Sequence, residues 1–376
     1  MKVYVFGTRG FPGVQGGVEK HCEYLYMNFP KDIQVTVFRR KSYIHQNVTY
    51  SNISFIDLPS TKIKGIEALV HSFLCSLVCI IKRPDIVHIH NIGPGFFVPL
   101  LRLFNLKVVL TYHSANYEHK KWGWLAKHFL KLSEKIALIF SNKIIFVNNF
   151  QLKKYRKSIQ NKSIYIPNGV SNFTRVDSIE YLTKLGVEPG KYILSVGRIT
   201  PEKGLDILIE AFSLANIEKD GFQLVIAGSV ENEMAYFHML QTKSINKKVI
   251  FAGGLNKECL RELYSHTKLF VLSSYSEGFP LVVLEAMQVG CNILLSKIPA
   301  TQIVSLDEKY YFKKGDVTDL AKQIKKKVAE TQNIFTYPIK DYSWNRVQKK
   351  TIIVYKTLFA EQYNLSLIHI SEPTRP

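Results

Sequence analysis

The segment Ser273–Gly290, SSYSEGFPLVVLEAMQVG, decides the fold prediction for this chain. It follows an apolar run, Lys268–Leu272, which predicts a buried strand. Serine, tyrosine and glycine then predict a turn, and a helix is expected from about Pro280, because a proline has no N–H to leave unpaired in a first helical turn. The free N–H groups of Leu281 and Val282, together with the helix dipole, predict an anion site suited to a phosphate.

Two carboxylates, Glu277 and Glu285, flank this expected anion site with seven residues between them. Carboxylates beside an anion site can bind the hydroxyl groups of a sugar, because an ionised carboxylate can accept two hydrogen bonds from a vicinal diol. The alternative is a solvated loop residue followed by an exposed helical one, which would hold for most isolated pairs with this spacing. Here the strand, the turn and the apolar helix come in the order that a binding site requires.

The stretch EGFPLVVLE resembles the E-x7-E signature of the family 4 retaining glycosyltransferases, which have the GT-B fold. The resemblance implies that Glu277 faces the sugar of a nucleotide-sugar donor and that Glu285 binds the ribose. It also places Phe279, Leu281 and Val282 in the donor-binding set. Proline at position 280 departs from the pattern, because many relatives have glycine there and proline removes one N–H.

The composition indicates a globular chain of two domains. With 376 residues the chain exceeds one ordinary core, and 46% hydrophobic residues exclude disorder. Five cysteines without a C-x-x-C pair predict buried thiols in a reducing cytoplasm. No signal peptide is expected, because the sequence opens with a strand pattern, MKVYVFG.

The charge balance favours anionic partners. Fifty basic and thirty acidic residues give a net charge of +20, which suits nucleic acid, an anionic membrane surface or nucleotide sugars. No nucleic-acid-binding motif is present, so nucleic acid is not expected as a partner.

The first half alternates short apolar runs with helical patterns, which predicts a parallel α/β sheet. The expected strands are Val3–Phe6, Gln34–Phe38, Ile53–Ile56, Asp85–His90, Lys107–Tyr112, Lys143–Val147 and Ser163–Ile166. A glycine-rich loop, Gly7–Gly17, follows the first strand, where doubly wound folds bind ligands. It could be a plain flexible turn; the family resemblance instead implies that Gly16 and Gly17 approach the donor diphosphate.

Histidines mark the ends of two expected strands. His88 and His90 share one face of their strand, a spacing that metals use, but with no third ligand nearby in sequence we expect packing rather than a metal site. A lone histidine such as His113 is usually structural. The resemblance places His113 between donor sugar and acceptor, although Ser114 stands where many relatives have aspartate.

Two segments bear on membranes. The apolar run within Gly65–Ile81 is shorter than the ~20 residues that a span requires, so we expect a buried helix. In the stretch 116–142, Leu125, Phe129, Leu132 and Ile136 recur at helical spacing among lysines. This predicts either a core-facing helix with a solvated basic face or an interfacial surface for an anionic membrane.

The second half restarts the strand–turn–helix pattern at KYILSVGRITPEKG. Arg198 and Lys203 lie in a loop bounded by glycines, and two cations near a helix start suit a diphosphate. Taken alone they could be surface salt-bridge partners, but both match family positions. The chain has no Asp-x-Asp metal motif, so we expect these cations, without a metal or other cofactor, to neutralise the leaving diphosphate.

The predicted fold class is α/β, of the GT-B type, with two Rossmann-like domains facing a cleft. The expected domains are 1–170 on the acceptor side and 171–343 for the nucleotide-sugar donor. A C-terminal segment, 344–364, is expected to return to the first domain, with its helix over about 344–359. The last residues, 365–376, resemble translated sequencing-adapter sequence and are interpreted as a non-native tail without helix pattern.

The predicted function is a retaining, metal-independent glycosyltransferase of bacterial surface-polysaccharide synthesis. Its expected partners are a nucleotide sugar, a glycan acceptor linked to polyprenyl diphosphate, and the inner face of the cytoplasmic membrane, where the protein would be peripheral. The expected catalytic set is Arg198, Lys203, Glu277 and His113. A nucleotide-sugar epimerase of the same fold or a non-catalytic polyanion-binding protein is the alternative; a nicotinamide dehydrogenase would need an acidic ribose partner after the second strand.

Overall fold

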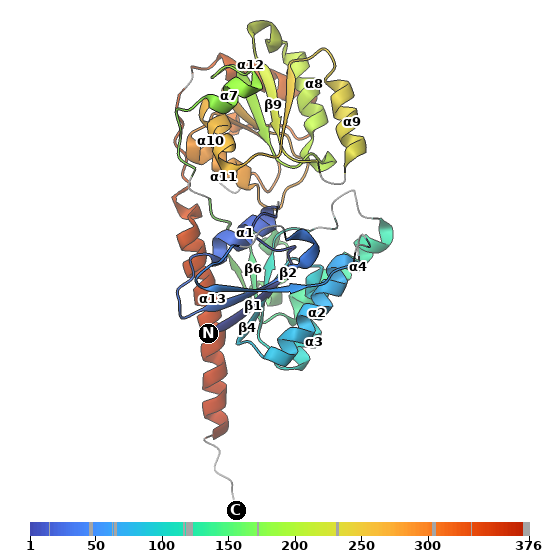
Figure 1. Ribbon diagram of the computed structural model, residues 1–376, viewed down its shortest axis with the longest axis vertical. Coiled ribbons are helices and arrows are strands. Elements are labelled where there is room, and N and C mark those ends of the chain that lie inside the picture. The colour runs from blue at the N-terminus through green and yellow to red at the C-terminus, as the bar shows by residue number, and fades with distance from the viewer. Residues whose placement is uncertain are drawn as a thin grey trace, which may run out of the picture. The chain divides into compact units, whose positions relative to one another are not determined.

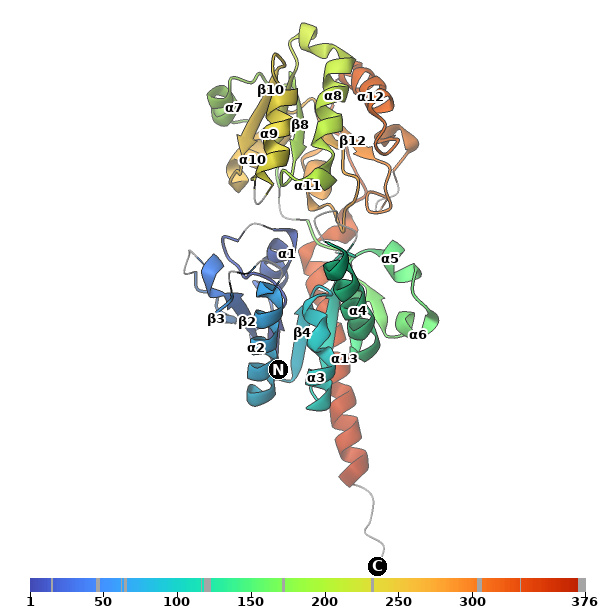
Figure 2. The same cartoon turned by 90° about the vertical axis from the view of Figure 1, so that its right-hand side faces the viewer.

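The chain forms two compact units in a computed structural model, which describes residues 1–14, 16–44, 48–61, 63, 66–115, 117, 123–170, 173–230, 233–302, 306–331 and 333–370. The first domain combines Met1–Gly169 with Tyr342–Pro376, and the second domain is Val170–Asp341. Both are drawn in Figures 1 and 2. Each is a doubly wound α/β domain, which confirms the predicted fold class of two Rossmann-like domains.

The first domain is built on a seven-stranded sheet of order β3-β2-β1-β4-β5-β6-β7, in which every neighbouring pair is parallel. The strands are β1 (Lys2–Phe6), β2 (Gln34–Arg40), β3 (Ile53–Leu58), β4 (Ile86–His90), β5 (Val108–Tyr112), β6 (Lys143–Phe146) and β7 (Ser163–Tyr165). The seven predicted strands are therefore confirmed. The strand order reverses between β1 and β4, so the loops after these strands lie at the point where such sheets bind ligands.

Helices cover both faces of this sheet. They are α1 (Gly17–Tyr26), α2 (Glu67–Lys82), α3 (Val98–Leu103), α4 (Trp124–Phe140), α5 (Asn149–Lys153), α6 (Lys157–Gln160) and α13 (Trp344–Ile370), with short 3-10 turns at Lys41–Tyr43 and Pro94–Phe97. One core lies between the sheet and α1 with α13; the other lies beneath α2, α3 and α4 (Figure 1). Because strand side chains alternate, Val3 and Val5 enter the first core and Phe6 the second.

The helix predicted within residues 65–81 is found as α2, but only one of its faces is buried, because Phe73, Leu77 and Ile81 are exposed. Its Cys75 and Cys79 have no solvent exposure and belong to the second core. Four of the five cysteines are buried, as predicted, and Cys259 is half-buried. Among the described residues, none of the helices combines the length and apolar character needed to cross a bilayer.

The second domain has a six-stranded parallel sheet of order β10-β9-β8-β11-β12-β13. Its strands are β8 (Tyr192–Val196), β9 (Gln223–Ala227), β10 (Val249–Gly253), β11 (Leu269–Leu272), β12 (Ile293–Ser296) and β13 (Tyr311–Phe312). Its helices are α7 (Glu180–Leu185), α8 (Leu205–Ala215), α9 (Met234–Lys243), α10 (Lys257–His266), α11 (Leu281–Val289) and α12 (Val317–Ala329) (Figure 2). A core that includes Phe212, Leu224, Leu269 and Leu320 joins α8 and α12 to the sheet.

The last helix is longer than its pattern predicts. We expected a helix ending near Phe359 and a tail without helix pattern, whereas α13 continues to Ile370. The physical reason is local, because no glycine or proline interrupts the chain between Trp344 and Ile370. The prediction that the tail adds nothing to the helix is therefore wrong up to Ile370.

Candidate functional site

In the second domain, the loops after β8 and β11 bring the predicted cation and carboxylate together. These strands are neighbours in the sheet, so their carboxyl ends meet at one edge. The Lys203 Nζ lies 2.6 Å from Glu277 Oε1, and the two side chains are 17% and 10% exposed. Ser274 Oγ donates to the same carboxylate oxygen at 2.6 Å. The pair is therefore shielded from water and fixed in direction, unlike an ordinary surface salt bridge.

Backbone contacts hold these two loops against each other. Ser273 Oγ donates to the carbonyl of Lys203 (2.9 Å), and the N–H of Tyr275 donates to the carbonyl of Glu202 (2.8 Å). Gly204 has φ +60°, and a Cβ there would lie 2.4 Å from the Ser273 carbonyl oxygen. Only glycine allows this approach, so the geometry of Lys203 and Glu277 is built into the backbone.

Arg198 stands on the same loop as Lys203, directly after β8, and is half-buried. The loop around it is tied to the end of β9: the N–H of Gly197 donates to Ala227 O (2.9 Å) and the N–H of Ile199 to Ser229 O (3.0 Å). The structure thus places both predicted cations at the carboxyl edge of the second sheet.

The start of α11 differs from the prediction of free amides. Pro280, with φ −80° and ψ 87°, precedes the helix, and the Leu281 N–H donates to the Phe279 carbonyl at 3.0 Å. These angles are close to those of an inverse γ-turn, which produces this bond. The expectation that Leu281 presents a free N–H is wrong, and a phosphate could use this amide only after the bond to Phe279 opens.

Glu285, on α11, is a buried carboxylate, 4% exposed. The Tyr264 hydroxyl, from α10, donates to Glu285 Oε2 at 3.1 Å. Burial, and then the nearby Glu285 charge, raise the pKa of Tyr264 well above its ordinary value, so this tyrosine stays a donor. The alternative of an exposed helical Glu285 is wrong. Sequence reasoning missed Tyr264, because it lies on another helix and belongs to no motif.

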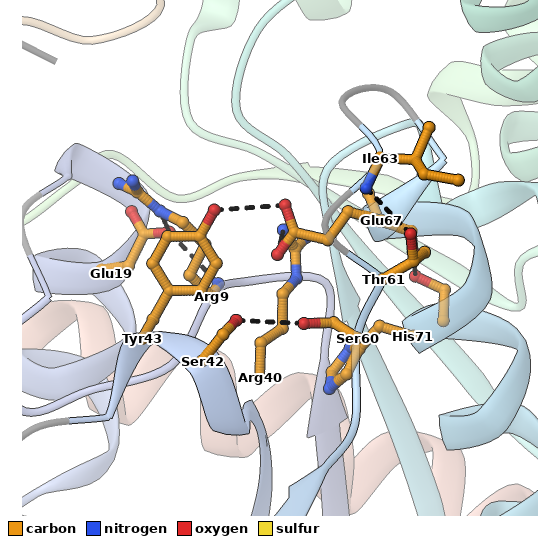
Figure 3. Close-up of polar contacts among 12 residues, drawn as sticks. Arg9, Glu19, Arg40, Ser42, Tyr43, Ser60, Thr61, Ile63, Glu67 and His71 are labelled. Carbon is orange, nitrogen blue, oxygen red and sulfur yellow. Dashed lines mark hydrogen bonds and ion pairs between the residues drawn. The ribbon is translucent and has the colours of Figure 1, made fainter. Parts of the chain in front are cut away.

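In the first domain, the glycine-rich loop is clamped by Glu19 (Figure 3). The carboxylate Oε1 accepts from the backbone N–H and the Nε of Arg9, both at 3.2 Å. A Cβ on Gly16 would lie 2.0 Å from Glu19 Oε2, so glycine makes room for this clamp. A Cβ on Gly17 would meet nothing within 4 Å, so the loop is open at Gly17.

A second polar group, which no motif indicated, lies at the ends of β2 and β3 (Figure 3). Tyr43 OH donates to Glu67 Oε2 at 3.1 Å, and Arg40 Nη1 lies 3.4 Å from Glu67 Oε1. Ser42 and Ser60 hydroxyls are 3.1 Å apart. These contacts join both strand ends to the start of α2, at the same edge of the sheet as the glycine-rich loop.

His113 belongs to a buried cluster of three imidazoles. One ring nitrogen from each of His21, His90 and His113 lies within 4.8 Å of the others. His90 Nδ1 and His113 Nε2 are hydrogen-bonded at 3.0 Å, and His21 Nδ1 is 2.7 Å from Asn168 Oδ1. The packing prediction for His90 is confirmed, because this side chain has no solvent exposure; the fold also brings it to His113, directly after β5, and to His21, on α1, which are distant in sequence. Sequence reasoning missed His21, which no motif marks on the buried face of α1.

His88 is held by hydroxyl groups instead. Its Nδ1 contacts Tyr26 OH (2.7 Å) and Tyr355 OH (2.5 Å), and its Nε2 contacts Thr111 Oγ1 (2.7 Å). Tyr26 OH also contacts His90 Nε2 at 2.8 Å, so the two groups form one network. The packing prediction for His88 is confirmed, with α13 supplying Tyr355.

Burial makes these imidazoles neutral. It lowers the pKa of His88 to about 3 and that of His21 to about 4, the latter against the opposing effect of the hydrogen bond that His21 donates to Asn168. It also lowers the pKa of His90 and of His113 well below the ordinary value. At neutral pH, each ring therefore offers one N–H and one lone pair.

Comparison with known proteins assigns a family description to each half. Residues 15–172 match the model of "Glycosyltransferase Family 4", and residues 179–333 match "Glycosyl transferases group 1".

Three curated relatives are glycosyltransferases. The uncharacterized glycosyltransferase MJ1607 of Methanocaldococcus jannaschii is 29% identical over 302 residues, 73% of this chain and 76% of that protein. The uncharacterized glycosyltransferase YqgM of Bacillus subtilis is 26% identical over 57% of this chain and 59% of its own length, which is less than two thirds of that protein. The serotype-specific mannosyltransferase WbdA of Escherichia coli is 33% identical over 38% of this chain and 18% of its own length.

Solved structures with the same fold include a sucrose-phosphate synthase from Thermosynechococcus elongatus, with a TM-score of 0.80 and 20% identity over 96% of this chain and 99% of that one. Anabaena HepE in complex with UDP-glucose has a TM-score of 0.75 and 15% identity over 96% and 99% of the two chains. These neighbours confirm the GT-B fold.

The buried histidines predict a loss of stability in mild acid. His21 and His88 have folded pKa values of about 4 and about 3, below the ordinary 6.5, so the unfolded chain binds more protons as the pH falls below 6.5. Between pH 7 and pH 5 each such histidine should lower the free energy of unfolding by about 2 kcal/mol. Urea unfolding at the two pH values measures this difference.

The same effect can be tested at a single site with His71→Leu, because burial also lowers the pKa of His71, on α2, to about 4. This variant keeps the histidine network of the first domain but has one buried imidazole fewer. Between pH 7 and pH 5 its free energy of unfolding should therefore fall by about 2 kcal/mol less than that of the wild type. Equal stability of the wild type at pH 7 and pH 5 would contradict the neutral, buried state of these rings.

Proposed function

Because this chain belongs to the glycosyltransferases that combine a family 4 domain with a group 1 domain, we propose that it transfers a sugar from a nucleotide-sugar donor to a glycan acceptor with retention of anomeric configuration. The observation that carries the proposal is the shielded pair of Lys203 and Glu277, at the carboxyl edge of the sheet in the domain that the group 1 model matches. A structural neighbour holds UDP-glucose, which supports a nucleotide sugar as donor.

The diphosphate of the donor would bind Arg198 and Lys203. A diphosphate that approaches Lys203 competes with Glu277 for its charge, and the released carboxylate then accepts hydrogen bonds from the sugar hydroxyls. The bond from the anomeric carbon to the diphosphate oxygen breaks while the acceptor oxygen bonds on the same face. The acceptor proton leaves with the diphosphate. The two cations stabilise the charge that develops on the leaving group, and no metal ion is needed for this step.

The ribose would bind Glu285. Tyr264 occupies Oε2 and fixes the direction of the carboxylate, and an ionised carboxylate has capacity for the two hydroxyls of a vicinal diol. Phe279, Leu281 and Val282 complete the donor-binding set, and the Leu281 amide would exchange its bond to Phe279 for the phosphate. Gly16 and Gly17 of the first domain would contribute to diphosphate binding, and His113 would position the transferred sugar.

The acceptor would be a lipid-linked glycan, of the polyprenyl-diphosphate type, in bacterial surface-polysaccharide synthesis. The likeness to WbdA, a serotype-specific mannosyltransferase, supports this role. The protein would then work as a peripheral protein at the inner face of the cytoplasmic membrane, where such an acceptor lies.

The surface of α4 supports membrane contact. Trp124, Leu125 and Leu132 are 70%, 75% and 51% exposed, so the expected core-facing stripe through Leu125 and Leu132 is wrong. The buried positions are Leu130, Ser133, Glu134, Ala137 and Leu138, which leaves apolar side chains outside among lysines. Exposed apolar side chains also occur on the two preceding helices, at Phe73, Leu77 and Ile81 on α2 and at Leu103 on α3. The part of the predicted basic stretch at 118–122 lies outside the described residues.

The ribose assignment predicts weaker nucleotide binding in Glu285→Gln. The amide keeps the size and the bond from Tyr264 but loses a charged acceptor, which costs about 1.5–3 kcal/mol, or roughly 10- to 150-fold in affinity. Calorimetric titration with UDP and GDP measures the change, and Glu188→Gln, at an exposed position, is the control. Wild-type affinity in Glu285→Gln would exclude Glu285 as the ribose ligand.

The function itself is tested by incubating the protein with nucleotide sugars and a lipid-linked acceptor. We expect a product of retained configuration, at a rate that Mg²⁺ and Mn²⁺ do not raise. Arg198→Ala combined with Lys203→Ala should lower the rate on the order of 10²–10³-fold or more, and the exposed Lys219→Ala should not. Donor consumption without an acceptor would favour the epimerase, and normal turnover in the double variant would exclude the pair from catalysis.

Membrane contact predicts salt-sensitive binding to anionic vesicles. Each lysine or arginine near such a surface contributes about 1 kcal/mol, and Trp124 and Leu125 add apolar burial. Sedimentation with phosphatidylglycerol vesicles at low and physiological salt should lose most binding in Trp124→Ser with Leu125→Ser. Ile353→Ser, at a 60% exposed position on α13, is the control. Wild-type protein that stays in the supernatant at both salt concentrations would contradict this location.

A further inference from the structure

The three imidazoles of His21, His90 and His113 have nearly the spacing of a metal site. Two nitrogens on one tetrahedral Zn²⁺ ion, each about 2.0–2.1 Å from it, lie roughly 3.3 Å apart. His90 Nδ1 and His113 Nε2 are 3.0 Å apart, and all three ligand nitrogens lie within 4.8 Å of one another. A shift of one ring by about 1.5 Å would therefore complete a three-nitrogen site.

His21 carries a buried lone pair within this cluster. Its Nδ1 faces Asn168 Oδ1 at 2.7 Å, and because an amide oxygen only accepts, Nδ1 carries the proton. Nε2 is then the unprotonated nitrogen; it is buried and has no hydrogen-bond partner among the described residues. An unsatisfied buried acceptor costs free energy, which a bound cation would recover.

Outer contacts orient the rings as they do in known metal sites. Metal-bound histidines usually donate their other ring N–H to a fixed oxygen, and Asn168 accepts in this way from His21. Tyr26 OH contacts the outer nitrogen of His90, Nε2, at 2.8 Å. His113 stacks on His90, with 27° between the ring planes. Outer oxygens thus fix the orientation of His21 and His90 before any cation binds.

From this geometry we propose that His21, His90 and His113 bind one divalent transition-metal ion. Three neutral imidazoles favour Zn²⁺, Co²⁺, Ni²⁺ or Cu²⁺ over Mg²⁺ and Ca²⁺, which prefer oxygen ligands. Three protein ligands leave a fourth tetrahedral position for water or another small ligand. The pattern in sequence pairs His90 with His88, but Tyr26, Tyr355 and Thr111 engage His88, so it is not a ligand.

The site does not depend on the proposed glycosyl transfer. It lies within the first domain and uses none of the cations and carboxylates assigned to the donor. His113 occurs in both proposals, so the test measures metal binding rather than turnover. Failure to bind a metal would leave the donor site untouched, and an inactive protein could still bind the metal.

The experiment uses the full chain without a polyhistidine tag, first stripped of metal with a chelator. Equilibrium dialysis against Zn²⁺, followed by elemental analysis, should give one equivalent bound, and dialysis against Mg²⁺ should give none. Co²⁺ should produce the intense visible absorption of a tetrahedral site. Wild-type protein that binds no Zn²⁺ or Co²⁺, or that shows only the weak spectrum of octahedral Co²⁺, would overturn the proposal.

Variants locate the ion. His21→Gln and His113→Gln should each lower affinity by about 100-fold or more, and Asn168→Leu, which removes only the outer contact, by about 10- to 100-fold. Asn168→Leu keeps all three ligands, so it remains informative if a histidine variant does not fold, which urea unfolding detects.

The control is His71→Gln. His71 is buried beside Cys75, with its Nδ1 3.5 Å from the sulfur, and is the competing place for a cation. This variant should bind like the wild type. Loss of binding in His71→Gln, or unchanged binding in both His21→Gln and Asn168→Leu, would place the ion elsewhere.

Discussion

The ion pair between Lys203 and Glu277 is the contact on which the site in the second domain depends. It joins two loops 74 residues apart in sequence, each at the end of one of two adjacent strands. Both charges are largely removed from water, so the pair persists only because Ser274 and the backbone bonds between the loops hold it. In the proposed function, the donor diphosphate would replace Glu277 at Lys203, and the sugar hydroxyls would replace Lys203 at Glu277.

The first domain is organised by buried polar groups that must all find partners. Four histidines and two tyrosines are buried in this domain, on β4, α1 and α13 and directly after β5. Each hydrogen bond in this network fixes a ring that would be costly to bury alone. Tyr355 belongs to it, so α13 contributes polar contacts as well as Val354 and Leu358 to the core. His21 Nε2 is the buried ring nitrogen of the cluster without a partner among the described residues, which is why this group is the place where a cation would stabilise the fold.

The sequence allowed the sheets to be predicted, because strands follow from short-range patterns, whereas the donor-binding roles stay predictions. Apolar runs gave the strands, and the turn before Leu281 gave the position of Glu277 and Glu285. What it did not give depends on contacts between distant segments: the approach of His21 to His90, and the bond from Tyr264 to Glu285. The Leu281 amide was mispredicted because Pro280 sets an angle that turns it toward Phe279.

The most direct test of a nucleotide-sugar site in the second domain is amide hydrogen exchange of the wild-type protein with and without UDP, GDP and ADP at saturating concentration. Slower exchange with at least one of them is predicted in 198–206 and 273–290, which contain the two loops, the start of α8 and all of α11. The Leu281 amide should be among those affected, because it would change partner. Unchanged exchange in both segments with a nucleotide that binds, or protection confined to the first domain, would contradict the account.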